Sequence, residues 1–545
     1  MPFFDLHCHP SFKSALLNDD LSLCPNPIDA VDIQLSVPFP ACVENLAGNS
    51  LDSQSSFDQI PGGSLVVAGF LAFERVYAFV PDLKKVKNLG ANVLQNMADE
   101  TESYHQLMTG RDLAHFQNFL PTPSGLRQYK LLTSITEYPS PPDPNTVYVV
   151  ASVEGVHNFY DRKKLAVQEH PDNQKEIVDK LETWKQESAK NPKKFPRLLH
   201  ITLAHHGQNV LTNHAWAIPI RFASTTVSVG SFNPTGNGLS PLGESFVRTA
   251  LRESPTEKRI LVDVKHLSLA SRRKVYEIMG EAEFADVPIL ATHMGVVGTS
   301  WQHPPIADIR PSTEHPKNQF ASYRRIGGFL RQVPPEPSGS LLTRIPFNPW
   351  SINLYDEDII RIMQSRGLIG VSLDRRILGG TLTGGPVEDE RFSRADFPPE
   401  WQVSAQDAPS FYPTEALPTL FDGNPSKANQ DRWAFCQNII HIVLMTELAK
   451  GNTNMADRVP ADVDPWDHIC LGSDYDGLIS AVKTCPTADH LPNLFDQKFE
   501  TVLGAMIEHL NKHALSLAKP IKVPAKIVEK LSFKNGLDFL KKHFV

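Results

Sequence analysis

The sequence predicts an α/β fold, a (β/α)8 TIM-type barrel with long insertions in its βα loops. Eight short, mostly apolar runs are spaced along the 545-residue chain, and helical patterns follow most of them. Parallel strands that are buried on both faces have this near-continuous apolar character. Strands that alternate with helices are typical of a closed parallel barrel. Five of the eight runs also end in a His, Asp or Glu, at the end of the strand where such barrels carry their chemistry.

The order of these elements predicts one barrel domain over 1–545. Strands are expected at 2–8, 64–70, 146–153, 198–204, 260–265, 288–292, 368–373 and 468–473, and helices at 269–281, 356–366 and 430–450. The 44 prolines cluster in the segments between these elements. Four insertions are therefore expected as loops or a lid over the barrel mouth, at about 10–63, 207–241, 294–351 and 375–429.

Composition excludes several classes of protein. The net charge is -8 and the isoelectric point about 6.2, without the basic stripe of a nucleic-acid binder. No apolar stretch is long enough to span a membrane, and the first residues lack the pattern of a secretory signal. The six cysteines are sparse and form no CxxC pair, which predicts reduced thiols and a cytoplasmic location.

The first strand ends in two histidines that can share a metal ion. His7 and His9 are two residues apart, so they point to the same side of a strand. Imidazole nitrogen suits zinc and related divalent ions. Such a short motif also fits two unrelated histidines near a strand end.

Four later strands end in similar residues. Glu154 follows an apolar run, where an unpaired carboxylate is costly to bury. His266, His293 and Asp474 each stand where a strand gives way to a loop. Taken singly, Glu154 also fits a salt bridge or a helix cap, and each histidine fits an ordinary buried side chain. Together with the first strand they supply four imidazoles and two carboxylates, which suffice for two metal ions with positions left for water.

The order of these residues along the chain resembles that of the amidohydrolase superfamily. The short sequence motifs around them resemble those of its membrane (renal) dipeptidase family. The resemblance runs from residue 3 to about residue 540 and rests on short motifs at 154–157 (EGVH), 201–205 (ITLAH), 263–268 (DVKHLS), 472–477 (GSDYDG) and 534–537 (KNGL).

The resemblance implies a dipeptidase-like hydrolase with two divalent metal ions, taken to be zinc. Glu154 would bridge the ions, His7 and His9 would bind one, and His266 and His293 would bind the other. Asp474 would serve as a metal ligand and take the proton from the bridging water. His205 would polarise the scissile carbonyl, and His205 and Asp476 would contact the substrate, a dipeptide or related amide. Related barrels often dimerise, so a homodimer is expected by analogy.

The chain departs from the family pattern at two places. The family usually has His-x-Asp on the first strand, and His9 in place of Asp makes the site more positive by about one charge. The arginine that holds the substrate carboxylate in dipeptidases has Ile352 in its place. The inserted loops offer substitutes, and the sequence does not select among Arg310, Arg324, Arg325 and Arg344.

Three other functions fit the same barrel. A metal-dependent phosphoesterase would need a basic groove for phosphate, which the charge balance disfavours. A lactonase would use the same metal-activated water. A non-catalytic binding protein on a hydrolase scaffold would be expected to lack a ligand, yet all six candidate ligands are present.

Overall fold

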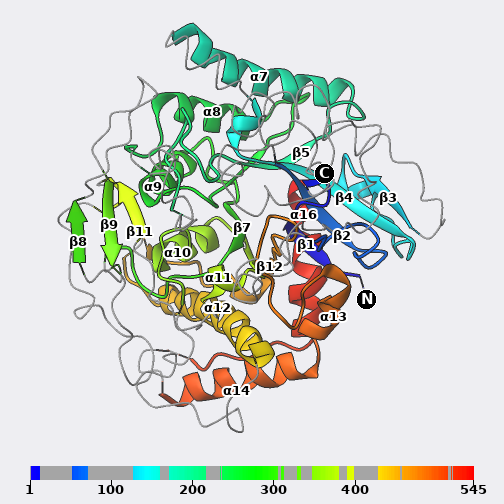
Figure 1. Cartoon of the computed structure of the whole chain (residues 1–545), viewed down its shortest axis with the longest axis vertical. Helices are drawn as coiled ribbons and strands as arrows, with labels where there is room; N and C mark the ends of the chain where they lie inside the picture. Colours follow the sequence, from blue (N-terminus) through cyan, green and yellow to red (C-terminus); the bar gives the residue numbers. More distant parts are fainter. Residues whose placement is uncertain are drawn as a thin grey trace, which may run out of the picture.

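A sheet of parallel strands forms the centre of the molecule (Figure 1). The computed structural model describes residues 2–12, 52–71, 127–159, 171–216, 234, 236–302, 304, 308–311, 328–332, 347–379, 390–393, 395–397, 427–454, 457–513, 517 and 519–545. Eight strands follow one another, each paired in parallel with the next: β1 (Phe4–Cys8), β2 (Leu65–Leu71), β4 (Thr146–Glu154), β5 (Leu198–Thr202), β6 (Leu261–Asp263), β7 (Leu290–Met294), β10 (Leu368–Val371) and β12 (Ile469–Leu471).

The last strand of this series returns to the first. Just beyond β12, the amide of Asp474 donates to the carbonyl of His7 at 2.9 Å. The amide of His9 in turn donates to the carbonyl of Tyr475 at 2.8 Å. These bonds nearly close a barrel of eight parallel strands, and the predicted (β/α)8 fold and its eight strands are confirmed. They also place the end of β1 directly beside the residues that follow β12.

Apolar sequence explains why these strands lie inside. All nine residues of β4 are buried, and the strand pairs with β2 on one side and with β5 on the other. A strand covered on both faces needs an apolar residue at nearly every position, and TVYVVASVE has one at most positions. Glu154 is therefore the exception in β4, a carboxylate at its last position with 1% of its surface exposed.

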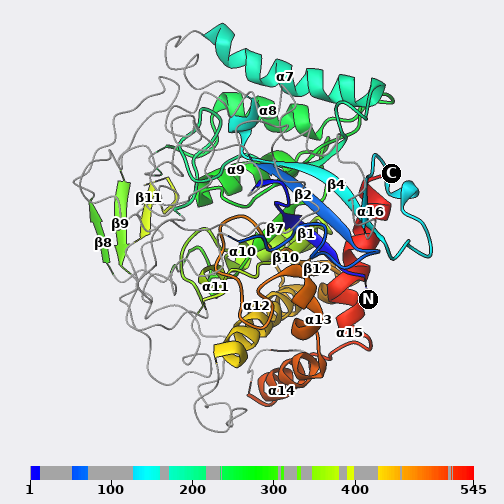
Figure 2. The ribbon, with the colours of Figure 1, turned by 45° about the vertical axis from the view of Figure 1, so that its right-hand side comes forward.

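Helices surround the barrel, with α7 and α8 on one side and α12 and α14 on the opposite side (Figures 1 and 2). The helices are α7 (Pro171–Lys190), α8 (Pro241–Leu251), α9 (Leu269–Met279), α10 (Asp356–Gln364), α11 (Arg375–Leu378), α12 (Lys427–Lys450), α13 (Leu491–Leu494), α14 (Gln497–His513), α15 (Ile527–Glu529) and α16 (Asn535–His543). The three helices predicted from sequence correspond to α9, α10 and α12, and are confirmed. Among the described helices, none is both long enough and apolar enough to cross a bilayer.

Local capping fixes where the helices start. The hydroxyl of Ser268 accepts a hydrogen bond from the amide of Ser271 and so caps α9, which begins three residues after His266. Ser240 caps α8 in the same way, and Pro241 takes the first helical position. Short 3-10 turns lie at Ile135–Glu137, Val156–Phe159, Pro465–Asp467 and Ala488–His490, and a π-helical turn, Lys530–Lys534, joins α15 to α16.

Four further strands were not predicted. β3 (Gln128–Leu131) adds to the barrel sheet beside β4. A separate antiparallel sheet has the order β11-β9-β8 and consists of β8 (Asp308–Pro311), β9 (Gly328–Gln332) and β11 (Glu390–Ser393). β8 and β9 belong to the insertion after β7, whereas β11 belongs to the insertion after β10. The two insertions are therefore joined to each other by backbone hydrogen bonds.

Much of the expected insertions lies outside the described residues. Their expected role as a lid, and the organisation of 1–545 as one domain, stay predictions. Of the six cysteines, four lie in the described part, and Cys8, Cys436, Cys470 and Cys485 are buried thiols outside any disulfide.

Candidate metal centre

The predicted ligands come together at the carboxyl end of the barrel. His7 lies in β1 and His293 in β7, and Glu154 is the last residue of β4. His9, His205, His266 and Asp474 follow the ends of β1, β5, β6 and β12 by one to three residues. Seven residues far apart in the sequence thus meet at one edge of the sheet.

Glu154 lies at the centre of this group. One oxygen, Oε1, is 3.1 Å from Nε2 of His266 and 3.4 Å from Nε2 of His293. The other oxygen, Oε2, is 3.1 Å from Nε2 of His9 and 3.7 Å from Nε2 of His205. His7 approaches Oε1 at 3.5 Å. Oε1 thus faces three histidines and Oε2 faces two, so imidazoles surround both oxygens of the carboxylate.

Hydrogen bonds fix the tautomers of two of these histidines. Nδ1 of His9 is 2.9 Å from the carbonyl oxygen of Gly69, which can only accept, so Nδ1 carries the proton. Nδ1 of His293 is 2.8 Å from the hydroxyl of Thr292, whose own proton goes to Asp263 at 2.7 Å. In their neutral forms both histidines therefore present an unprotonated Nε2 to Glu154.

An acceptor nitrogen beside a carboxylate oxygen needs a proton or a cation between them. The Nε2 atoms of His7 and His9 are 3.0 Å apart, and those of His266 and His293 are 3.2 Å apart. An ion bound at about 2.0–2.1 Å to each nitrogen of a tetrahedral site holds such nitrogens about 3.4 Å apart. Two three-residue groups, His7–His9–Glu154 and Glu154–His266–His293, offer ligand atoms that all lie within 4.8 Å of one another. These donor sets fit divalent metal ions.

Backbone strain holds two of the side chains in place. His266 and Asp474 both have a φ of 62°, in the left-handed region that non-glycine residues rarely adopt. Strained residues of this kind gather at functional sites, where the surrounding structure enforces them. Oδ1 of Asp474 is 3.7 Å from Nε2 of His9, and Asp474 forms a further ligand group with His7 and His293.

Burial dominates the electrostatics of the centre. It lowers the pKa of His7 to about 4 and that of His266 to about 3. Burial also lowers the pKa of His9, but hydrogen bonding to Glu154 and its charge outweigh this and raise the value to about 9. Burial, and then the charge of Glu154, raise the pKa of Asp474 above its usual range. Most of the imidazoles are thus neutral and free to bind a metal.

Asp476 has a different environment from the other predicted site residues. Its Oδ2 accepts hydrogen bonds from the amide and hydroxyl of Ser55 at 2.7 and 2.6 Å, and its Oδ1 accepts from the amide of Gln54 at 2.8 Å. With 2% of its surface exposed, Asp476 anchors the 52–60 segment. Its expected contact with substrate stays a prediction.

The role of the four arginines named as possible partners of a substrate carboxylate stays a prediction. Ile352 is buried, with 2% of its surface exposed. Arg324, Arg325 and Arg344 lie outside the described residues, and only the backbone of Arg310, in β8, is described.

Two residues of this region were not predicted from sequence. His206 lies beside His205, with the ring centroids 3.7 Å apart. Lys265 is 1% exposed, and its Nζ has no hydrogen-bond partner within the described part of the chain. Burial lowers the pKa of Lys265 to about 8, against the opposing charges of Asp474 and Glu154. The signals available in the sequence were the doubled histidine of LAHH and a lysine directly before His266.

Comparisons with known proteins found no matching family model and no matching curated protein. Solved structures do match. They include a metallopeptidase from Rhodobacter sphaeroides liganded with a phosphinate mimic of the dipeptide L-Ala-D-Ala, at 13% identity and a TM-score of 0.43, covering 100% of this chain and 99% of that one. A dipeptidase of metallopeptidase family M19 matches at 13% identity and a TM-score of 0.42, with coverages of 100% and 99%. The probable dipeptidase PvdM from Pseudomonas aeruginosa matches at 12% identity and a TM-score of 0.40, with coverages of 99% and 94%. At such low TM-scores and identities these matches add nothing to what the strand pairings of the chain itself show.

Proposed function

We propose that this chain is a metal-dependent hydrolase that uses two divalent ions, zinc by preference, to cleave an amide bond in a dipeptide or related small molecule. The observation that carries this proposal is that Nε2 of His9 and Nε2 of His293 both lie beside Glu154, and in the neutral form of each ring this nitrogen is an acceptor. Such an arrangement is favourable only with a cation or a proton between the two acceptors. The sequence motifs shared with the membrane dipeptidase family support the choice of reaction.

The metal ions would lower the pKa of a bound water and polarise the scissile carbonyl. Glu154, His7 and His9 would hold the first ion, and Glu154, His266 and His293 the second. Asp474 lies beside His9 with part of its side chain exposed (15%), so it can accept the proton of the attacking water and deliver it to the leaving amine. His205 can donate a hydrogen bond to the carbonyl oxygen as negative charge develops there.

The metal content of the purified protein tests this proposal first. Wild type is expected to hold about two equivalents of zinc, and Glu154→Gln far less, because the variant replaces the shared carboxylate. Glu187→Gln, on the outer surface of α7, is the matched control and should keep the wild-type content. A wild type that stays free of metal after incubation with zinc would contradict the proposal and favour a non-catalytic scaffold.

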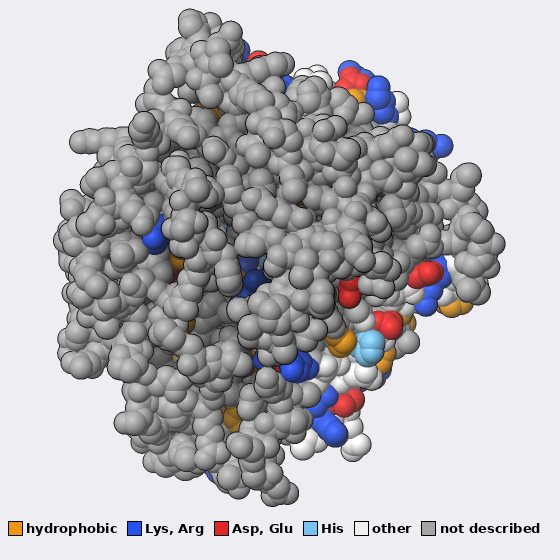
Figure 3. Space-filling model, viewed as in Figure 1, with side chains coloured by type: hydrophobic (Ala, Val, Ile, Leu, Met, Phe, Trp, Pro, Cys, Tyr) orange, Lys and Arg blue, Asp and Glu red, His pale blue; other side chains and the backbone are white. Residues whose placement is uncertain are grey.

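A substrate screen then separates the reactions that fit the same centre. Dipeptides, N-acyl amino acids, lactones and phosphodiesters should be compared on the metal-loaded protein. Amide cleavage is the expected result. On the face drawn in Figure 3, described acidic and basic side chains lie beside one another along the right-hand side. Hydrolysis of phosphodiesters or lactones alone would contradict the assignment of an amide substrate.

A further inference from the structure

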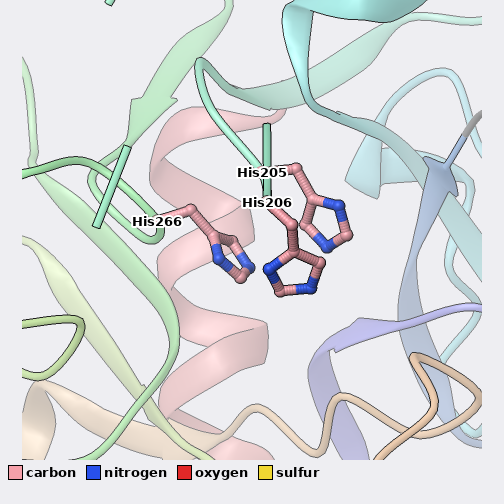
Figure 4. Close-up of side chains that lie close together, drawn as sticks. All are labelled: His205, His206 and His266. Atoms are coloured by element: carbon pink, nitrogen blue, oxygen red, sulfur yellow. The ribbon is translucent and has the colours of Figure 1, made fainter. Parts of the chain in front are cut away.

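Three histidines form a cluster beside the proposed metal centre and share His266 with it. His205 and His206 follow β5, and His266 follows β6. Their ring centroids are 3.7 Å (His205–His206), 4.6 Å (His205–His266) and 5.1 Å (His206–His266) apart. Figure 4 shows the three imidazoles facing one another across the gap between the two loops. One nitrogen from each lies within 4.8 Å of the others.

The surroundings of the cluster suit a metal ligand set. His205 and His266 are buried, and His206 is half-buried, so His206 is the most exposed of the three. A tetrahedral ion needs its nitrogens about 3.4 Å apart, so small side-chain rotations would bring the three rings into ligand distance and leave a fourth position for water. His266 has a left-handed φ of 62°, and its ring lies close to those of His205 and His206 as well as to that of His293.

We infer that His205, His206 and His266 form an alternative position for the second metal ion, which we call the triple-histidine position. The other position, Glu154–His266–His293, is called the carboxylate position. His266 belongs to both groups, and its Nε2 faces Glu154 at 3.1 Å; we take this nitrogen to serve one position or the other. This inference deepens the proposed function, because it rests on the same metal centre.

The two positions differ in chemistry. Three imidazoles favour nitrogen-preferring ions such as Ni²⁺ and Cu²⁺, whereas a carboxylate position better accommodates Mn²⁺. An ion in the triple-histidine position also engages His205, which is then unable to stabilise the substrate carbonyl. Occupation of this position therefore gives a metal-loaded but inactive form, and nitrogen-preferring ions in excess would inhibit.

The metal content of the wild type and of four variants tests the inference. Wild type is expected to hold about two equivalents of zinc, and His293→Ala to keep about two, because the second ion moves to the triple-histidine position. His206→Asn should also keep two through the carboxylate position, and the double variant should fall to about one. His490→Asn, on an exposed turn, is the matched control.

The outcomes separate this inference from the proposed function. If wild type holds two equivalents of zinc and the single variant His293→Ala holds only one, the triple-histidine position is overturned. The proposal of a binuclear hydrolase is unaffected by that result. No metal in wild type would overturn both. Circular dichroism checks that each variant folds.

Wild-type crystals provide a measurement that needs no variant. Anomalous diffraction after a Ni²⁺ soak should show a peak bonded to His206, and after a Mn²⁺ soak a peak between Glu154 and His293. A Ni²⁺ peak at the carboxylate position with none beside His206 would overturn the inference.

Discussion

The backbone of Gly69 lies directly against the ring of His9. The carbonyl oxygen of Gly69 is 2.9 Å from Nδ1 of His9, and a Cβ at Gly69 would stand 2.9 Å from Cε1 of the same ring. The same Cβ would approach Cε1 of His7 at 3.2 Å. Strand β2, which contains no predicted ligand, thus fixes the tautomer of His9 and limits the space for the rings of His7 and His9.

Gly69→Ala is therefore expected to weaken metal binding at His7 and His9 by about 10-fold or more, as changes to the partners of ligating histidines commonly do. The added methyl group has to displace the His9 ring, since the opposing contact is closer than real Cβ atoms allow. Zinc affinity, measured by competition with a chelator, is the test. Gly504→Ala in α14, where a Cβ meets nothing within 4 Å, is the matched control and should bind zinc as wild type does. Equal affinities in both variants would argue against a role for the Gly69 contact.

Asp474→Asn should lose most of the turnover number while its fold is unchanged, because the amide cannot accept the proton of the attacking water. A general base contributes about 10²- to 10⁴-fold, which sets the expected loss. Metal content should be measured alongside: retained metal indicates proton transfer, and lost metal indicates a ligand role. Asp489→Asn, whose side chain is 55% exposed, serves as the control. Normal turnover in Asp474→Asn would remove the residue from the mechanism.

Asp476→Ala is expected to destabilise the protein rather than to change substrate affinity selectively. The substitution leaves the amides of Gln54 and Ser55 and the hydroxyl of Ser55 without their carboxylate partner. Loss of buried hydrogen bonds to a charged group costs about 1.5–3 kcal/mol, which denaturant unfolding can measure. A wild-type free energy of unfolding combined with a raised KM would instead support the substrate contact expected from sequence.

Glu357 makes the stability of the protein depend on pH. Burial raises the pKa of this carboxyl from 4.5 to about 8, although Ser300 and the amide of Trp301 donate hydrogen bonds to it. The native state then binds the proton more tightly than the unfolded chain does, so the free energy of unfolding falls as pH rises from about 4.5 to about 8. Glu357→Gln removes this contribution. The free energy of unfolding of the variant minus that of wild type should therefore be more positive at pH 9 than at pH 5. Urea unfolding at both pH values checks this, with Glu500→Gln on the exposed face of α14 as control. A stability difference that is the same at both pH values would contradict the assignment.

The barrel strands were predictable because a strand that is buried on both faces requires a nearly continuous run of apolar residues. β3 was not, since QYKL alternates between exposed and half-buried positions at the edge of the sheet. β8, β9 and β11 lie in proline-rich insertions and pair across a large separation in sequence, which no local pattern indicates.

In the site too, features set by neighbouring residues in the sequence were predictable, and features set by residues far apart in the sequence were not. Strand-end positions identified residues that the fold brings together around Glu154. The anchoring role of Asp476 depends on Gln54, 422 residues away, and so was invisible. The pairing of His206 with His266 depends on how two loops bend after their strands, which sequence spacing does not specify.

The small sheet β11-β9-β8 makes the insertions after β7 and β10 structurally dependent on each other. Arg391 in β11 pairs with Leu330 in β9, so deleting either insertion alone would strip a strand of its hydrogen-bonding partner and leave an open edge prone to aggregation. A shortened descendant of this chain would have to lose both segments in one event or replace one with a segment that restores the pairing. The two insertions are therefore expected to be gained or lost together in evolution, although they are separate in the sequence.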